Sequence, residues 1–131
     1  MDLGNLKESS CVLAIDDADA VLEIERAALE AEGFKVYTTT NPREGVEIYR
    51  QHREKIQLVL LDYTMPEMNG GEVFHCMKQI SPSVNVCLVT SREDAEIYQL
   101  LAAGVRGYIR KPFRLEDIVH CAHKTCRTAS S

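Results

Sequence analysis

Five polar residues in this chain of 131 residues lie at the end of a short apolar run or just after one. They are Asp16, Asp17, Asp62, Thr90 and Lys111. In open α/β sheets, ligands bind outside the carboxyl ends of the parallel strands. If the runs are such strands, three acids, a hydroxyl and an amine converge at one edge of a sheet.

This set of side chains suits phosphate and metal chemistry. Crowded carboxylates raise one another's pKa unless a cation lies among them, and oxygen ligands with open positions for water and phosphate suit Mg²⁺. An Asp carboxylate can also act as a nucleophile towards phosphorus. Phosphoryl transfer depends mainly on positioning and charge neutralisation, which a metal ion, a lysine and a hydroxyl donor supply. The set therefore fits phosphoryl transfer.

Taken singly, each residue has a simpler structural explanation. An Asp at a strand end is more often a turn former or helix cap than a nucleophile, and we expect Asp19 to be such a residue. Thr90 and Ser91 could cap the helix that follows them, and Lys111 could be a solvated loop charge. Their joint placement at the ends of successive strands favours the chemical interpretation.

Short apolar runs alternate five times with segments of helical periodicity, joined by short connections. Parallel strands need crossovers, so this order predicts an α/β fold, a doubly wound five-stranded parallel sheet with helices on both faces. We expect strands at residues 11–15, 34–39, 58–61, 84–89 and 105–109, and helices at 18–32, 42–53, 71–80, 95–103 and from about 115. In the first helix, Glu25 is expected away from a core face made of Val21, Ile24, Ala28 and Ala31.

Length and composition limit the classes of function. The length suits one domain, residues 11–127, and we interpret residues 1–10 and 128–131 as polar tails. The net charge of -5 and the lack of a Lys/Arg block argue against direct nucleic-acid binding. No apolar stretch approaches the roughly 20 residues of a membrane span and no signal peptide is visible, so we expect a cytoplasmic protein without a membrane partner. Five cysteines in apolar surroundings predict free thiols.

One combination of motifs extends over about residues 11–126. It consists of the acid pair Asp16-Asp17, the segment Asp62-x-x-Met65-Pro66-x-Met68-Asn69-Gly70, Thr90, Tyr108 and the pair Lys111-Pro112. Together these motifs resemble those of the CheY-like receiver domain of two-component response regulators, a (βα)5 flavodoxin-like fold. The segment Gly70-Gly71-Glu72-Val73-Phe74 is similar to receivers of hybrid histidine kinases.

The resemblance implies a phosphoprotein that works as a switch. Asp62 would accept a phosphoryl group from a phosphohistidine on a histidine kinase or a histidine phosphotransfer protein. The Mg²⁺ ion would be held by Asp62, Asp17, the backbone carbonyl of Thr64 and, mainly through water, Asp16.

The resemblance also assigns roles to the remaining motifs. Lys111 would pair with the phosphate, and a cis Lys111-Pro112 peptide bond would aim it into the site. Thr90 would donate to a phosphoryl oxygen. Tyr108 would then turn inward. The face built from the fourth helix, fifth strand and fifth helix would change and bind a downstream protein target, or a second copy in a phosphorylation-dependent dimer.

Three functions stay open at this point. The first is a signalling switch with self-catalysed phosphotransfer and autodephosphorylation, not a metabolic enzyme, either stand-alone or part of a larger protein. The second is a small phosphatase with an Asp nucleophile, although such hydrolases usually carry a second acid where this chain has Thr64. The third is a phosphorylation-independent pseudo-receiver, which the intact set of motif residues argues against.

A zinc site on the last helix is a weaker interpretation. Its candidate ligands cannot all point at one ion, because they fall within seven residues of one helix. We interpret them as part of a partly buried terminal helix: His120, Cys121, His123 and Cys126.

Overall fold

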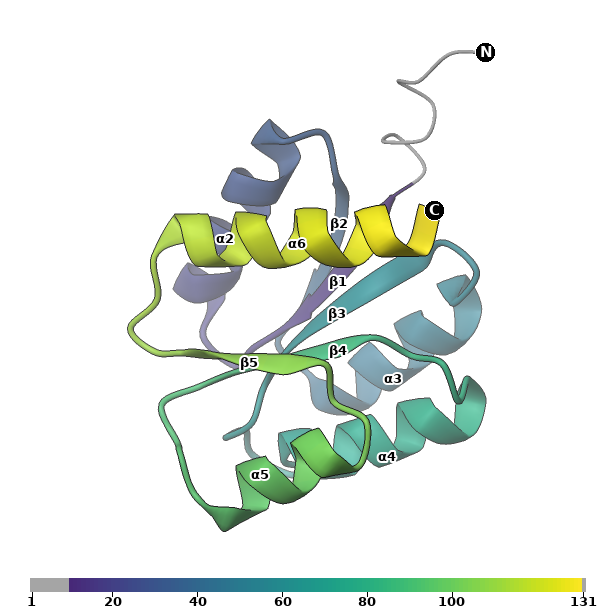
Figure 1. Cartoon of the computed structure of the whole chain (residues 1–131), viewed down its shortest axis with the longest axis vertical. Coiled ribbons are helices and arrows are strands. Elements are labelled where there is room, and N and C mark those ends of the chain that lie inside the picture. The colour runs from purple at the N-terminus through teal and green to yellow at the C-terminus, as the bar shows by residue number, and fades with distance from the viewer. Residues whose placement is uncertain (1–9, 131) are drawn as a thin grey trace.

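The five expected strands form one parallel sheet in the order β2-β1-β3-β4-β5 (Figure 1). The computed structural model describes residues 10–130. The strands are β1 (Cys11–Ile15), β2 (Lys35–Thr39), β3 (Ile56–Asp62), β4 (Val86–Thr90) and β5 (Gly107–Arg110). The doubly wound α/β prediction is confirmed.

Helices cover both faces of the sheet (Figure 1). They are α2 (Asp19–Ala31), α3 (Pro42–His52), α4 (Gly70–Ile80), α5 (Ala95–Ala102) and α6 (Leu115–Ser130). Side chains of α2 and α6 pack on one face, and those of α3, α4 and α5 pack on the other. Among the described residues, no helix is both long enough and apolar enough to cross a membrane.

The central strands are buried on both faces, as expected for a parallel sheet between two helix layers. Every residue of β1 and β4 is buried. Alternate side chains of β1 enter different cores, with Leu13 and Ile15 facing α3–α5 and Val12 and Ala14 facing α2 and α6. This burial on both sides holds the carboxyl ends of the strands in a fixed position.

The prediction of which residues of α2 face the core is wrong. Leu22, Glu25 and Leu29 are its buried residues, whereas Ile24 is 48% exposed. The helix packs through its two leucines, which lie seven positions apart and have more apolar area to bury than alanines. Glu25 lies between them on the same face and is only 2% exposed.

The two predicted tails have different outcomes. Helix α6 continues to Ser130, so the backbone of residues 128–130 is helical. No glycine or proline follows residue 113 to stop the helix. The predicted N-terminal tail lies mostly outside the described residues, but Ser10 belongs to the fold, because it is buried and its carbonyl accepts a hydrogen bond from the Lys35 amide.

Candidate functional site

Strands β1 and β3 deliver two buried acids to the same edge of the sheet. Ile15 pairs with Leu61 in the strand register, so the next residues, Asp16 and Asp62, lie side by side. Their exposures are 1% and 5%, while Asp17 is exposed. One ligand oxygen from each of these three acids lies within 4.8 Å of the others. The cluster occupies the point where the strand order reverses, which is where open α/β sheets bind ligands.

Lys111 reaches this acid cluster from the loop after β5. Its ammonium group lies 2.9 Å from Asp16 Oδ2 and 3.6 Å from Asp62 Oδ1. The Lys111-Pro112 peptide bond is cis, as the motif resemblance implies. The backbone amide of Lys111 donates to the carbonyl of Thr90 at 3.0 Å, which joins the ends of β4 and β5.

The surroundings of Asp62 hold its pKa above the ordinary value. Burial contributes most and the negative charge of Asp16 adds to it, while Lys111 and the backbone amide of Thr64 act in the opposite direction. Together these effects raise the pKa of Asp62 from 3.8 to about 6. At neutral pH Asp62 is therefore mostly a carboxylate with little solvent around it, as a nucleophile requires.

Lys111 stays charged in this site. Burial lowers its pKa, but the hydrogen bond to Asp16 and the charges of Asp62 and Asp16 outweigh that effect and leave the pKa raised. Lys111 is therefore the positive charge that offsets the two buried acids.

Thr90 ends β4 beside this cluster and does not cap a helix. It is 1% exposed, and its hydroxyl oxygen accepts a hydrogen bond from the Arg92 amide at 3.1 Å. The cap of α5 is Asp94, which accepts from the Ile97 amide. The simpler explanation of Thr90 and Ser91 as helix caps is thus wrong.

Asp19 is not a cap either. It lies in the first turn of α2, whose N-cap is Ala18 without a side-chain hydrogen bond. The Ala18 amide donates instead to Asp16 Oδ1 at 2.9 Å.

The amino-acid sequence matches the model of the response regulator receiver domain over residues 12–123. The chain belongs to this family. The receiver is 31% identical over 109 residues to the probable transcriptional regulatory protein TcrX of Mycobacterium tuberculosis and 28% identical over 109 residues to the response regulator SaeR of Staphylococcus aureus. Each match covers 82% of this chain and 46% of the relative, so the chain spans about half the length of these relatives.

A solved receiver domain from Clostridium thermocellum has the same fold, with a TM-score of 0.86 and 25% sequence identity. The match covers 92% of this chain and 97% of that one. The predicted family and fold are confirmed, and a phosphatase or a pseudo-receiver is not favoured.

Tyr108 lies on the α5 side of the receiver sheet, and no hydrogen bond joins it to the acid cluster. Its ring is half-buried, and its hydroxyl donates to Glu93 Oε1 at 3.0 Å. Arg110 donates to the same oxygen at 3.0 Å. Glu93 therefore links two neighbouring side chains of β5 to the loop that follows Thr90.

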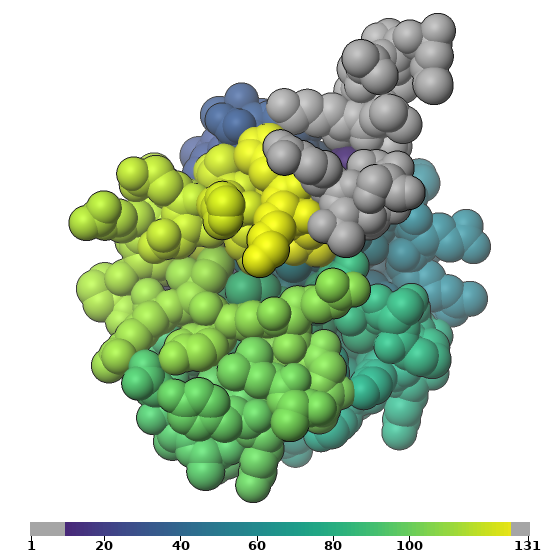
Figure 2. Space-filling view, viewed as in Figure 1, coloured from purple at the N-terminus to yellow at the C-terminus, as the bar shows by residue number. Residues whose placement is uncertain are grey.

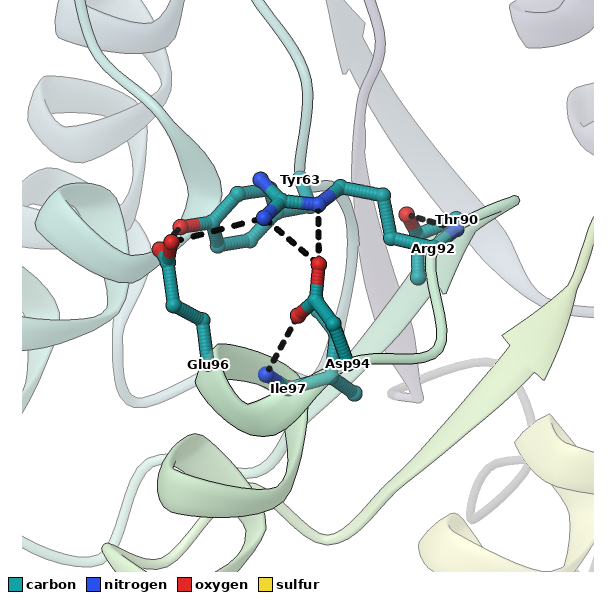
Figure 3. A network of polar contacts seen from close by, with 6 residues as sticks. All are labelled: Tyr63, Thr90, Arg92, Asp94, Glu96 and Ile97. Atoms are coloured by element: carbon teal, nitrogen blue, oxygen red, sulfur yellow. Dashed lines mark hydrogen bonds and ion pairs between the residues drawn. The ribbon is translucent and has the colours of Figure 1, made fainter.

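A polar network beside Thr90 is a feature that sequence reasoning missed (Figure 3). The Arg92 guanidinium lies over the Tyr63 ring, 4.6 Å from its centroid, and pairs with Asp94 at 2.6 Å and Glu96 at 3.4 Å. The Tyr63 hydroxyl donates to Glu96. The network joins the residue after Asp62 to the start of α5. Only the position of Tyr63 next to Asp62 could have indicated it.

Two of the candidate zinc ligands of α6 lie in different surroundings. His123 contacts Glu32 at 2.7 Å, and Cys121 lines a cavity together with Cys87. Within residues 10–130 as described, the acid cluster is the one group of three or more His, Cys, Asp or Glu side chains close enough to share an ion. None of the five cysteines is in a disulfide in the part of the chain that the structure describes, as predicted.

Proposed function

We propose that this receiver accepts a phosphoryl group on Asp62 from a phosphohistidine of a histidine kinase or histidine phosphotransfer protein. An oxygen of the Asp62 carboxylate attacks phosphorus, the new O–P bond forms, and the P–N bond to the donor imidazole breaks. The electron pair of that bond stays on the imidazole nitrogen. The observation that carries this proposal is the buried Asp62 carboxylate with Lys111 at 3.6 Å and two further acids beside it.

The acid cluster fits Mg²⁺ in the chemistry of its donors. Three carboxylates offer hard oxygen ligands within 4.8 Å of one another, and Lys111 alone does not neutralise them. Asp16, Asp17 and Asp62 would hold the ion, with the Thr64 carbonyl as the further protein ligand. When bound, Mg²⁺ supplies positive charge that offsets the charge of the phosphoryl oxygens.

Lys111 and Thr90 act on the phosphoryl group after transfer. The Lys111 ammonium pairs with a phosphoryl oxygen, and the Thr90 hydroxyl donates to another. The shared backbone hydrogen bond between these two residues supports a joint response. Tyr108 then turns inward and leaves Glu93.

The output surface is the face formed by α5, β5 and α6, which holds Tyr108. Its occupant is a downstream protein or a second copy of the receiver, and no nucleic acid binds directly. The charges of Glu93 and Arg110 at this face change partners when Tyr108 leaves, which alters the surface that a partner meets.

Phosphorylation by a small phosphodonor tests the proposal. The protein is incubated with acetyl phosphate, with and without Mg²⁺, and its intact mass is measured. We expect one phosphoryl adduct that requires Mg²⁺ and is absent from Asp62→Asn. Asp19→Asn is the matched control, because it removes an exposed acid outside the cluster. An adduct of equal yield in Asp62→Asn would refute the assignment.

A further inference from the structure

Two cysteines lie close together on the face of the sheet opposite α4 and α5. Cys87 lies in β4, and Cys121 lies on α6, which packs over it. Both side chains line one cavity and belong to the same packed cluster, and neither forms a disulfide. The proposed phosphoryl transfer uses neither of them, so their pairing calls for its own explanation.

A cavity connects this thiol pair to the surroundings. Its volume is about 520 Å³, and it lies between β5 and α6 with both Cys87 and Cys121 in its lining. Figure 2 views the molecule from the side where α6, in yellow, lies beside β5, in green. Cys87 itself is only 3% exposed, so a small molecule in the cavity meets Cys121 more readily. The cavity also has room for a peroxide molecule, which is about the size of two waters.

The two thiols differ in their surroundings. Cys121 interacts with the Cys87 thiol and the Thr125 side chain and lies near the charge of Lys124. These contacts outweigh burial and lower the pKa of Cys121, whereas Cys121 and burial raise the pKa of Cys87, which lies deeper and close to Glu25. Cys121 is also the more exposed of the two thiols, so it is the one that a peroxide in the cavity meets first.

We propose that Cys121 and Cys87 form a peroxide-sensitive thiol pair that closes to a disulfide between α6 and β4. The Cys121 thiolate attacks one oxygen of a hydroperoxide, an S–O bond forms, the O–O bond breaks, and the departing oxygen leaves as water or an alcohol after taking up a proton. Cys87 then attacks the sulfenic sulfur, the S–S bond forms, and the S–O bond breaks with release of water. The two thiols are oxidised by two electrons, and the peroxide is reduced.

A metal site is a poorer explanation of the same residues. The described residues bring together no third cysteine, histidine or acid close enough to share an ion with this pair, since the only such cluster is the one around Asp62. Structural zinc sites need four ligands, whereas a disulfide needs only two thiols in contact.

Peroxide treatment of the whole protein tests the thiol pair. The reduced protein is treated with hydrogen peroxide, the remaining thiols are blocked with N-ethylmaleimide in denaturant, and intact mass and peptide maps are recorded. We expect two fewer maleimide adducts and one peptide linking Cys87 to Cys121. We also expect Cys121 to be oxidised before Cys76, because Cys121 lines the open cavity beside a second thiol that can close the disulfide.

Serine variants separate the roles of the two thiols. Cys121→Ser should abolish the link, and Cys87→Ser should leave a sulfenic acid on Cys121 that dimedone traps. Cys76→Ser, on the half-buried thiol of α4, is the matched control and should form the link normally. A link between other cysteines, or oxidation of Cys76 before Cys121, would overturn the proposal.

The thiol test stands apart from the proposed function. Mapping the unaltered protein locates the disulfide even if a serine variant fails to fold. Asp62→Asn should form the Cys87–Cys121 link at the same rate, whether or not Asp62 is the phosphoacceptor.

Discussion

The ammonium group of Lys111 lies closer to Asp16, at 2.9 Å, than to Asp62, at 3.6 Å. The lysine therefore compensates the charge of Asp16 more strongly than that of Asp62, the proposed phosphoacceptor. Asp62 keeps a raised pKa of about 6 in spite of the neighbouring positive charge. This uneven sharing of one lysine by two acids has consequences that can be measured.

Lys111→Ala should raise the pKa of Asp62 above about 6 in the absence of Mg²⁺. The lysine lowers this pKa, so its removal leaves burial and the charge of Asp16 opposed only by the Thr64 amide. Carboxyl ¹³C NMR titration measures the value. Arg114→Ala, which removes an exposed cation of the same loop, should leave the titration unchanged. An unaltered Asp62 titration in Lys111→Ala would contradict the expected role of the lysine.

Asp62→Asn should stabilise the metal-free protein at pH 7.5. The folded-state pKa of about 6 exceeds the ordinary 3.8, so the folded state binds the proton more tightly than the unfolded state does. Stability is then lost as pH rises from about 4 to about 6, and the variant escapes this loss. We expect a gain of about 1–3 kcal/mol at pH 7.5 that disappears near pH 4.

Urea unfolding in EDTA at the two pH values checks this expectation. Asp19→Asn, an exposed acid of α2, serves as the control. A gain in stability that is equal at both pH values would show that the charge of Asp62 is not its cause.

Glu25→Gln should remove most of the pH dependence that the buried Glu25 gives to the free energy of unfolding. Burial, with the charges of Asp16 and Asp62, raises the pKa of Glu25 from 4.5 to about 8. Wild-type stability should fall as pH rises between these values, because the folded state must then hold a buried charge. The variant should be more stable by about 2–4 kcal/mol at pH 9 and similar near pH 4.5.

Unfolding free energies measured across this pH range test whether Glu25 causes the pH dependence of stability. Glu23→Gln is the matched control, since it changes an exposed acid on the same helix. If both variants follow the same pH profile, Glu25 does not carry the effect.

Gly70→Ala should destabilise the protein by about 1–3 kcal/mol. A Cβ atom at Gly70 would lie 2.8 Å from the Tyr63 Cα and 3.0 Å from the Asp62 carbonyl oxygen, so α4 could not keep its place against the end of β3. Gly107→Ala meets no atom within 4 Å and should change stability by less than about 0.5 kcal/mol. Chemical denaturation compares the two, and equal effects would contradict the steric argument.

Tyr63→Phe and Glu96→Ala should be coupled in a double-mutant cycle. The hydroxyl of the buried Tyr63 donates to the Glu96 carboxylate, so the first change removes the donor and the second removes the acceptor of the same contact. We expect a coupling energy of about 0.5–1 kcal/mol from unfolding measurements. Additive effects of the two substitutions would mean that the contact does not contribute to stability.

Much of the fold and of the acid cluster was predictable because both follow from short-range patterns. Apolar runs that end in acids locate the strands in the sequence, and parallel pairing then brings Asp16 beside Asp62. The burial of Glu25 was not predictable, because a glutamate is expected on the solvent side of a helix. Its burial depends on how α2 packs against the sheet, which the sequence pattern does not show. The pairing of Arg92 with Tyr63 depends on two loops meeting in space, and sequence spacing does not report that.

The backbone hydrogen bond from the Lys111 amide to the Thr90 carbonyl makes the two loops mechanically dependent on each other. We expect a displacement of the β4–α5 loop to shift the β5–α6 loop through this bond, and the reverse. The two residues to which the proposed function assigns the phosphate contacts would then move together. Engagement of the phosphate at either residue alone should therefore shift both loops.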